Sequence, residues 1–299
     1  MMFKDVCEIK GRNLKTILAT ATIFLTYQLT WLTNLYATQG QTVIAGAIYN
    51  ADNDTTADAD ANIDANYLTN GTKIYREAAL SLKPVTDKVT SHTYEIMYGK
   101  ILLPYYFLNP RMKMLEIGLG CDMGYGPGAS VALFQKLFRD AELWEAEYDA
   151  ACVEKHKGSG KLDGIKTLVG DQGNDIILDG WIEKSGGNFD VVIDDGGHQN
   201  CQIWHSFQKL WPTIKPGGLY FIEDMQVAKK KGYRLANTAT CDENLIFPEK
   251  LKEHFDNLMY DTSRKSDIEF MFCQSEACVL GKKRTYPELH IKSHNEVNV

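Results

Sequence analysis

The chain has 299 residues, of which 44% are hydrophobic and 24% are charged, and its formal net charge is −7. This length suffices for one large α/β domain with an appendage. The acidic balance and the lack of a basic stripe argue against a nucleic-acid partner. The seven cysteines include no CxxC pair, which argues against a zinc or thiol-redox motif and leaves one or two disulfides possible, with pairings that the sequence does not give.

Residues 16–36, near the amino terminus, form an uncharged run of 21 residues. A helix of that length can cross a bilayer. The basic residues that precede it are Lys4, Lys10, Arg12 and Lys15. They predict a cytosolic amino terminus and a translocated remainder, that is, a single-pass type II membrane protein of the endoplasmic reticulum or Golgi with a lumenal catalytic domain. A cleaved signal peptide, which would give a secreted protein, and a buried core helix are the alternatives.

A polar stretch rich in Ala, Asp, Asn and Thr follows, and it is typical of a flexible stem. Asn53 and Asn70 each begin a glycosylation sequon there, which favours a lumenal glycoprotein. The predicted division is a cytosolic tail at 1–15, a transmembrane signal anchor at 16–36, a stem at 37–72, a main domain at 73–284 and a tail at 285–299.

The main domain alternates predicted helices and strands. Amphipathic helices are predicted over 73–82 and 94–106, and further helices over 131–138 and 204–210. Strands are predicted within 112–120, over 142–149, 165–169, 190–193 and 218–222, and as a closing hairpin of 267–273 with 277–280. The alternation predicts a parallel sheet with one antiparallel edge. The tyrosine-rich helix 94–106 is expected to pack on that sheet, or else to cap a ligand pocket into which His92 or Tyr94 reaches.

A glycine turn follows the first strand, where Glu116, Gly118 and Gly120 stand in the sequence LEIGLG. Glycines let the backbone approach a ligand closely, and the helix that follows offers free N–H groups. The third glycine of the dinucleotide fingerprint GxGxxG is missing, which leans away from NAD and towards another nucleoside ligand.

Acidic residues near the ends of the next two strands fit a nucleoside as well. Glu147 is the predicted acceptor for the two ribose hydroxyls, with Glu145 and Asp149 as rivals. Asp171, in the sequence GDQ after the third strand, is suited to an adenine amino group.

Two apolar runs, 191–193 and 219–222, both end in acids. The first is followed by Asp194, Asp195 and His198, and the second by Glu223 and Asp224. If both runs are neighbouring parallel strands, four carboxylates and an imidazole converge on one sheet edge, where a divalent cation would offset their repulsion. DDGG is also rich in turn formers, so a capping role is the alternative for the two aspartates, and a local hydrogen bond is the alternative for His198. Matching acids at two strand ends favour the metal.

The order of these motifs resembles the class I S-adenosylmethionine-dependent methyltransferases. The motifs that carry the resemblance are LEIGLG at 115–120, the acid Glu147, GDQ at 170–172, FDVVIDDGGH at 189–198 and KPGGLYFIED at 215–224. The combination resembles more narrowly the metal-dependent sugar O-methyltransferases of macrolide pathways, the mycinamicin and macrocin type. The resemblance implies a Rossmann-like, mostly parallel seven-stranded sheet with helices on both faces, with S-adenosylmethionine and Mg²⁺ or Mn²⁺ as cofactors.

The same resemblance implies roles for individual residues. The implied metal ligands are Asp195, Glu223 and Asp224, and the implied catalytic base is His198. The predicted cofactor-binding residues are Glu116, Gly118, Gly120, Glu147, Asp171, Gln172 and Asp194. The predicted function is metal-assisted methyl transfer to a hydroxyl, of a sugar or glycoside. A catechol-type or other small-molecule O-methyltransferase, and a non-catalytic protein of the same fold, are the alternatives.

Overall fold

The computed structural model describes residues 70–234, 244–260, 263 and 265–285. The predicted cytosolic tail, the predicted transmembrane segment and most of the predicted stem lie outside these ranges. None of the helices within the described ranges is both long and apolar enough to span a bilayer.

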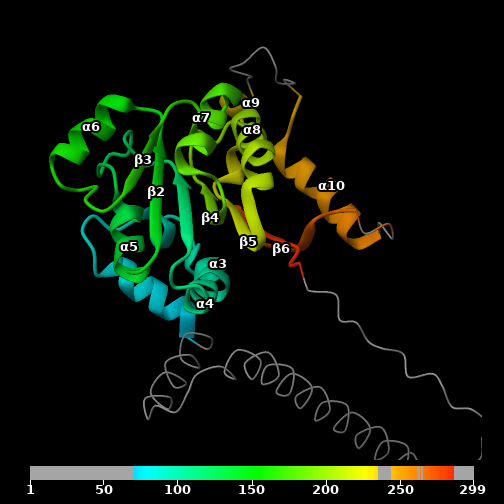
Figure 1. The fold of residues 1–299 in the computed structure, drawn as a ribbon, viewed down its shortest axis with the longest axis horizontal. Coiled ribbons are helices and arrows are strands. Elements are labelled where there is room, and N and C mark those ends of the chain that lie inside the picture. Colours follow the sequence, from blue (N-terminus) through cyan, green and yellow to red (C-terminus); the bar gives the residue numbers. More distant parts are fainter. Residues whose placement is uncertain (1–69, 235–243, 261–262, 264, 286–299) are drawn as a thin grey trace, which may run out of the picture. The chain divides into compact units, whose positions relative to one another are not determined.

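One seven-stranded sheet, with the strand order β3-β2-β1-β4-β5-β7-β6, organises the fold (Figure 1). Strands β1 to β5 pair in parallel, whereas β7 runs antiparallel to β5 and β6 runs antiparallel to β7. The strands are β1 (Lys113–Ile117), β2 (Glu142–Glu147), β3 (Lys166–Val169), β4 (Phe189–Asp194), β5 (Ile214–Ile222), β6 (Ile268–Gln274) and β7 (Ala277–Lys282). The predicted mostly parallel sheet with a closing antiparallel hairpin is confirmed.

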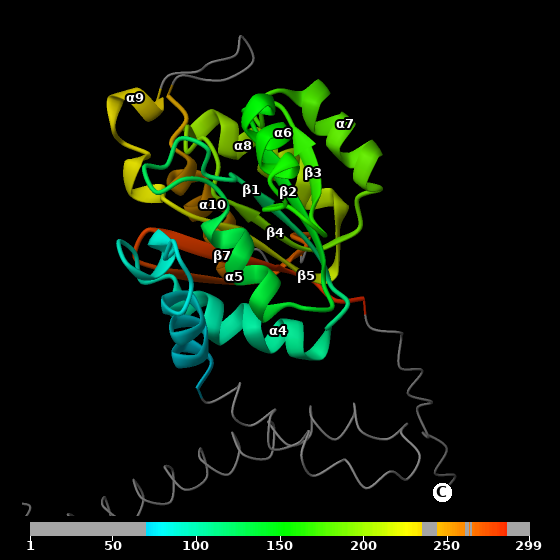
Figure 2. The same cartoon turned by 90° about the vertical axis from the view of Figure 1, so that its left-hand side faces the viewer.

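Helices cover both faces of the sheet (Figure 2). They are a helix over residues 70–80, η1 (Asp87–Val89), α3 (Glu95–Met97), η2 (Tyr98–Leu102), α4 (Leu103–Leu108), α5 (Ala129–Leu137), α6 (Ala150–Gly158), α7 (Asp175–Ser185), α8 (Asn200–Leu210), α9 (Lys231–Arg234) and α10 (Phe247–Tyr260). The predicted helix 94–106 is α3, η2 and α4 in succession. Helices α6, α7, α9 and α10 were not predicted.

The folded part begins earlier than predicted. Gly71, which the sequence assigned to the stem, lies in the first helix and packs so closely on Gly99 that a Cβ atom there would lie 2.0 Å from the Gly99 carbonyl oxygen. The described helix therefore includes residues 70–72, which precede the predicted start of the main domain. The alternating Ala, Asp and Asn pattern before it gave no sign that the last residues join a helix.

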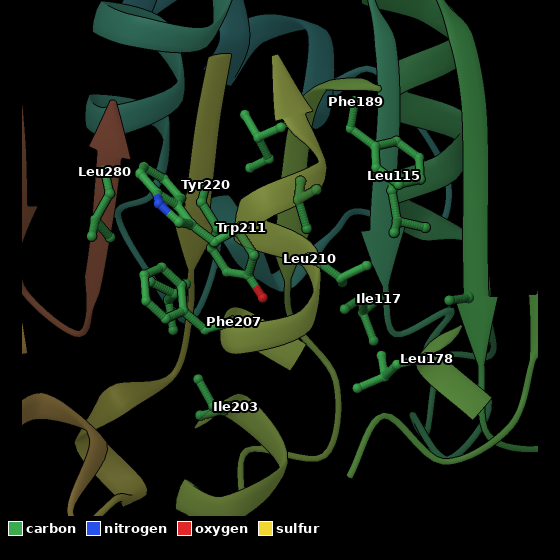
Figure 3. Close-up of a cluster of buried hydrophobic side chains, with 14 of the residues drawn as sticks. Leu115, Ile117, Leu178, Phe189, Ile203, Phe207, Leu210, Trp211, Tyr220 and Leu280 are labelled. Carbon is green, nitrogen blue, oxygen red and sulfur yellow. The ribbon is translucent and has the colours of Figure 1, made fainter. Parts of the chain in front are cut away.

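The core is divided between the two faces of the sheet. Successive side chains of a strand point to opposite faces. In β4, Val192 accordingly joins one buried cluster, and Val191 and Ile193 join the other. The first cluster includes Leu178 of α7, and Ile203, Phe207 and Leu210 of α8 (Figure 3). The second includes Tyr75, Tyr94, Met97 and Tyr98 from the amino-terminal helices, and Phe134 of α5. The expectation that the tyrosine-rich segment packs on the sheet is thus confirmed.

The strand order also determines where a ligand can bind. From β1 the chain continues to β2 on one side, and from β4 it continues to β5 on the other, while β1 and β4 are neighbours. In open parallel sheets, ligands bind in the crevice outside the carboxyl ends of the strands at such a switch point. Gly118 lies here, and its φ of +110° and the backbone oxygen of Asp195, 2.0 Å from where a Cβ would stand, both require glycine.

Two disulfides lie within the described residues, Cys121–Cys152 and Cys273–Cys278. Cys201 is disulfide-bonded as well. The sequence left these pairings open, because residues 31 positions apart, such as Cys121 and Cys152, are brought together by the fold alone.

Candidate active site

The acids that follow β4 and β5 converge at the carboxyl edge of the sheet. The two strands are paired in parallel, with Asp194 opposite Ile222, so the residues that come next leave the sheet side by side. Asp195, His198 and Asp224 each offer one ligand atom, and these atoms all lie within 4.8 Å of one another. The Nε2 atom of His198 lies 3.5 Å from Oδ2 of Asp224 and 3.9 Å from Oδ1 of Asp195.

Two residues of this group have an unusual backbone. His198 has a φ of 53° and Asp224 a φ of 55°, both in the left-handed region that residues other than glycine seldom adopt. Such conformations cost about 1–3 kcal/mol each and tend to gather at functional sites. Here they turn the two side chains towards each other instead of along their strands' directions.

Glu223 is paired with a buried lysine, Lys88, which comes from η1 and not from the sheet. Nζ of Lys88 lies 2.9 and 2.8 Å from the two carboxylate oxygens of Glu223 and 2.6 Å from Oδ2 of Asp195. The Lys88 and Glu223 side chains are each only 1% exposed. The Tyr98 hydroxyl donates a further hydrogen bond to Oε1 of Glu223. The ammonium and the hydroxyl thus hold Glu223 on the inner side of the cluster, beneath Asp195.

The pKa values of Lys88 and Glu223 depend on each other and on the charge of Asp195. Burial raises the pKa of Glu223 well above its usual value, and the charge of Asp195 adds to this, whereas Lys88 opposes it. Burial alone would lower the pKa of Lys88, but the charges of Asp195 and Glu223 outweigh it and raise the pKa well above its usual value. Lys88 is therefore a protonated counter-ion for two carboxylates.

Asp224 is held from the side of the amino-terminal segment. The Tyr94 hydroxyl donates to Oδ1 of Asp224 at 2.6 Å, and Nε2 of His92 lies 3.5 Å from the same oxygen. On its other side, Nδ1 of His92 is 2.6 Å from Glu276, in the turn between β6 and β7. Burial would raise the pKa of Asp224, but the Tyr94 hydrogen bond and the two nearby imidazoles outweigh it and lower the pKa. His92 and Tyr94 thus reach the site, while Tyr94 also packs in the core.

Asp194 and the GDQ segment interact with the chain itself. Oδ1 of Asp194 accepts from Nε2 of Gln172 at 2.8 Å, and its Oδ2 accepts from Ser206 and Tyr220. The Gln172 Oε1 atom accepts from the Gly197 N–H at 2.9 Å, so this side chain ties the DDGG turn to β3. Asp171, for its part, accepts from the N–H of Gly173 and from Gln202.

The glycine turn after β1 lies beside this cluster. Gly118 and Gly120 both have positive φ angles, as the close approach of the loop requires. Glu116, at the end of β1, is buried, accepts from the Ser130 hydroxyl at 2.7 Å and lies 3.4 Å from Nζ of Lys88. Burial raises the pKa of Glu116. Lys88 therefore lies between the glycine-turn acid and the acids of β4 and β5.

Glu147 ends β2 opposite the same turn. Its Oε2 accepts from the Leu119 N–H at 3.1 Å, and its Oε1 accepts from the Asp149 N–H at 3.0 Å. The two rivals have other surroundings: Asp149 caps helix α6, and Glu145 is buried within the strand. Of the three, Glu147 is the partly exposed acid beside the glycine turn.

Sequence reasoning missed Lys88 and Tyr98. Lys88 is 107 positions from Asp195, and Tyr98 is 125 positions from Glu223. A lysine in a polar segment looks like a solvated residue.

Comparisons with known proteins bear on this site. No family model matches the chain. The chain is 31% identical over 176 residues to the mycinamicin VI 2''-O-methyltransferase of Micromonospora griseorubida, covering 54% of this chain and 41% of that protein. It is 31% identical over 165 residues to the demethylmacrocin O-methyltransferase of Streptomyces fradiae, covering 51% and 39%. The chain therefore spans less than half the length of the curated relatives it matches.

A solved structure shares the fold. The MycE methyltransferase of the mycinamycin biosynthetic pathway, in complex with Mg, SAH and mycinamycin VI, superimposes with a TM-score of 0.53 at 27% identity, covering 64% of this chain and 49% of that chain. A second MycE structure, in complex with Mg and SAH, gives a TM-score of 0.52 at 27% identity, covering 66% and 52%.

The predicted location is corrected by the same comparisons. The matching relatives are O-methyltransferases of the bacterial genera Micromonospora and Streptomyces, which have no endoplasmic reticulum or Golgi. The prediction of a lumenal protein, whether anchored or released by signal cleavage, is therefore wrong. It depended on the uncharged run 16–36, which is outside the described residues, and on chance sequons.

The site lies at the switch point of the sheet and contains a glycine turn and neighbouring acids. This arrangement is consistent with the similarity to O-methyltransferases whose structures hold Mg and SAH. Over about half of its length, the chain is a homologue of bacterial sugar O-methyltransferases, and its described residues have the Rossmann-like fold of the class I methyltransferases.

Proposed function

We propose that this chain transfers the methyl group of S-adenosylmethionine to a hydroxyl oxygen of a sugar or glycoside, with the help of a divalent metal ion. The observation that carries the proposal is the convergence of Asp195, His198 and Asp224 at the sheet edge next to the glycine turn of β1. Residues 73–284 would form the methyltransferase domain, preceded by the helical residues 70–72.

The donor set fits a hard divalent cation. Mg²⁺ and Mn²⁺ prefer carboxylate oxygens, and Asp195 and Asp224 present theirs close together and partly exposed. Glu223 is proposed as the third ligand. A carboxylate has about four acceptor directions, and the contacts with Lys88 and Tyr98 use three of those of Glu223. One direction on Oε2 remains for the ion.

The reaction needs a hydroxyl that is made acidic, oriented and deprotonated. A bound divalent ion lowers the pKa of a hydroxyl that it coordinates. His198 is the proposed proton acceptor: its side chain is 22% exposed, and its Nε2 atom lies 3.5 Å from Asp224 and 3.9 Å from Asp195. The positive-φ backbone of His198 and the Tyr94 hydrogen bond to Asp224 keep these groups in place.

The cofactor is proposed to lie across the carboxyl ends of β1 and β2. Gly118 and Gly120 would let the backbone of the turn approach the cofactor closely. Glu147 would accept hydrogen bonds from the ribose hydroxyls, and Asp171 would face the adenine. Glu116, Gln172 and Asp194 are buried, so their proposed contribution is to support the turns on which the cofactor lies.

Glu147→Gln is expected to weaken the binding of S-adenosylhomocysteine by about 10–100-fold, because charge-assisted hydrogen bonds contribute roughly 1.5–3 kcal/mol each. Isothermal titration calorimetry measures this directly. Glu154→Gln, on the exposed face of α6, is the matched control and should bind like the unchanged protein. Equal affinity of Glu147→Gln and the control would remove Glu147 from the cofactor site.

The transfer itself is tested with radiolabelled S-adenosylmethionine, Mg²⁺ and parallel panels of glycosides and phenols. Label is expected on glycosides, to be lost with EDTA and restored by Mg²⁺ or Mn²⁺ in excess of the chelator. Label on phenols alone would replace the sugar proposal by a catechol-type reaction. Activity that persists in EDTA would contradict the metal. Cofactor binding without transfer to any acceptor would favour a non-catalytic protein.

A further inference from the structure

We propose that the Cys121–Cys152 disulfide positions the two loops that bind the nucleoside half of the cofactor, so that opening it weakens cofactor binding while the fold persists. The inference rests on the proposed function, because it presumes a cofactor at the carboxyl ends of β1 and β2. The Cys121–Cys152 disulfide would then have a role in cofactor binding in addition to stabilising the domain.

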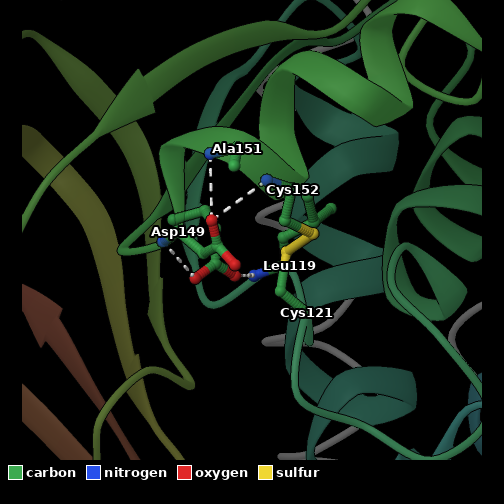
Figure 4. Close-up of a disulfide and its surroundings, with 6 residues drawn as sticks. Leu119, Cys121, Asp149, Ala151 and Cys152 are labelled. Atoms are coloured by element: carbon green, nitrogen blue, oxygen red, sulfur yellow. Dashed lines mark hydrogen bonds between the residues drawn. A yellow bond between two sulfur atoms is a disulfide. The ribbon is translucent and has the colours of Figure 1, made fainter.

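The disulfide joins the segments on either side of the proposed nucleoside site (Figure 4). Cys121 is in the loop between β1 and α5, immediately after the glycine turn. Cys152 is in the first turn of α6, five positions after Glu147. The Cα atoms of the pair are 6.2 Å apart. A covalent bond therefore joins the two segments that the nucleoside half of the cofactor would contact.

Hydrogen bonds beside the disulfide join the same two loops. The Leu119 N–H donates to Glu147 at 3.1 Å, and the Asp149 N–H donates to the other oxygen of Glu147 at 3.0 Å (Figure 4). Asp149 accepts in turn from the N–H groups of Ala151 and Cys152, at 2.9 and 3.0 Å. The orientation of Glu147 is therefore linked, through its backbone partners, to both ends of the disulfide.

Backbone hydrogen bonds also order the glycine loop, among them those from the Gly118 N–H to Ala146 at 2.8 Å and from the Gly128 N–H to Leu119 at 2.9 Å. Four of its glycines, Gly118, Gly120, Gly126 and Gly128, have positive φ angles, and glycine loses more conformational freedom on ordering than any other residue. The apolar cluster beneath it has four buried members, Leu119, Val131, Val153 and Leu162, with both cysteines packed against it. This cluster is separate from the two large ones of the sheet. Because this apolar cluster is small, the covalent bond adds to the backbone hydrogen bonds a link between the glycine loop and the start of α6.

The expected consequence is a loss of pre-organisation. With the bond open, the loop must be ordered when the cofactor binds, and that ordering reduces the affinity. The chain offers a matched control in Cys273–Cys278, which closes the turn between β6 and β7 and is separated by five positions in the sequence. It lies on strands at the opposite edge of the sheet from β2 and β3.

The test is calorimetric titration of the full chain with S-adenosylhomocysteine in metal-free buffer. The double variant C121S/C152S is expected to bind about tenfold or more weakly than the unchanged protein, whereas C273S/C278S should bind with unchanged affinity. Thermal unfolding of each variant is followed by circular dichroism, which separates lost binding from lost fold.

Reduction provides a second arm that needs no mutation of the site. Dithiothreitol transfers two electrons and two protons to the disulfide, giving the thiols of Cys121 and Cys152 and its own cyclic disulfide. The reduced protein, still folded by circular dichroism, should bind as weakly as C121S/C152S, and reduction of that variant should change its affinity no further. Because dithiothreitol also opens Cys273–Cys278 and the disulfide of Cys201, the same reduction is carried out on C273S/C278S, and the single variant Cys121→Ser replaces the double variant if the latter does not fold.

Two results would overturn the inference. Unchanged affinity for S-adenosylhomocysteine in folded C121S/C152S, together with a lower unfolding temperature, would leave the disulfide as a brace only. An equal loss of affinity in C273S/C278S would show that no local role exists. If the unchanged protein binds no S-adenosylhomocysteine, the proposed function fails and the inference falls with it, which is a different result from either of these.

Discussion

Replacing His198 by alanine is expected to lower the rate of methyl transfer by about 10²–10⁴-fold, the usual contribution of a positioned general base. The imidazole is the group beside Asp195 and Asp224 that can accept the hydroxyl proton, and it is partly exposed where an acceptor would enter. The measurement is the initial rate with labelled S-adenosylmethionine and saturating Mg²⁺. Binding of S-adenosylhomocysteine should be unaffected, because the carboxylates that His198 approaches are those of Asp195 and Asp224, which are proposed as metal ligands.

His92→Gln is the comparison for this result. His92 approaches Asp224 from the opposite side and is paired with Glu276, so its loss should affect the position of Asp224 and reduce the rate less than the loss of His198. A larger loss of rate in His92→Gln than in His198→Ala would transfer the role of base to His92. Similar rates in His198→Ala and the unchanged protein would remove His198 from the mechanism.

Lys88→Met is expected to lower the free energy of unfolding by about 3–5 kcal/mol, the typical cost of removing one partner from a buried ion pair. The change leaves Glu223 and Asp195 without the ammonium that contacts both, in a site from which water is largely excluded. For a domain of this size, the melting temperature should fall by on the order of 10 °C. Urea unfolding followed by circular dichroism, in the presence of EDTA, measures the difference.

Magnesium should offset part of this loss. A divalent ion bound near Asp195 would supply positive charge where Lys88 no longer does, so Mg²⁺ should raise the melting temperature of Lys88→Met more than that of the unchanged protein. Lys252→Met, on the exposed face of α10, is the control and should melt like the unchanged protein. A Lys88→Met protein as stable as the control would mean that Lys88 is not the counter-ion of the cluster.

Local sequence patterns were sufficient for much of the sheet and for the outline of the site. The short apolar runs of β1, β4 and β5 are buried on both faces, as parallel strands covered by helices must be, and such runs are recognisable without a structure. Glycine or acidic residues follow the ends of these strands. Because the carboxyl ends of parallel strands lie at the same edge of a sheet, the sequence predicted that Gly118, Asp195 and Asp224 lie at one edge. Helix α10 was not predicted, although Phe247, Leu251, Phe255 and Leu258 recur at helical spacing along it.

The amino-terminal prediction shows the limit of composition. Hydrophobic length and basic flanks are compatible with an anchor, but two sequons and a charge pattern in a single chain occur often by chance. The homologues come from bacteria, and this comparison contradicts the predicted lumenal location.

The sequence by itself determined the order of the strands, the glycine turn and the acids at the strand ends, because each depends on residues close together in the chain. The tertiary structure alone decided that Lys88 and Tyr98 hold Glu223, that Tyr94 and His92 hold Asp224, and that Cys121 is paired with Cys152. Those contacts join segments 31 to 135 positions apart. They arise from the packing of the amino-terminal helices on the sheet and of the loops on one another, which no local pattern encodes.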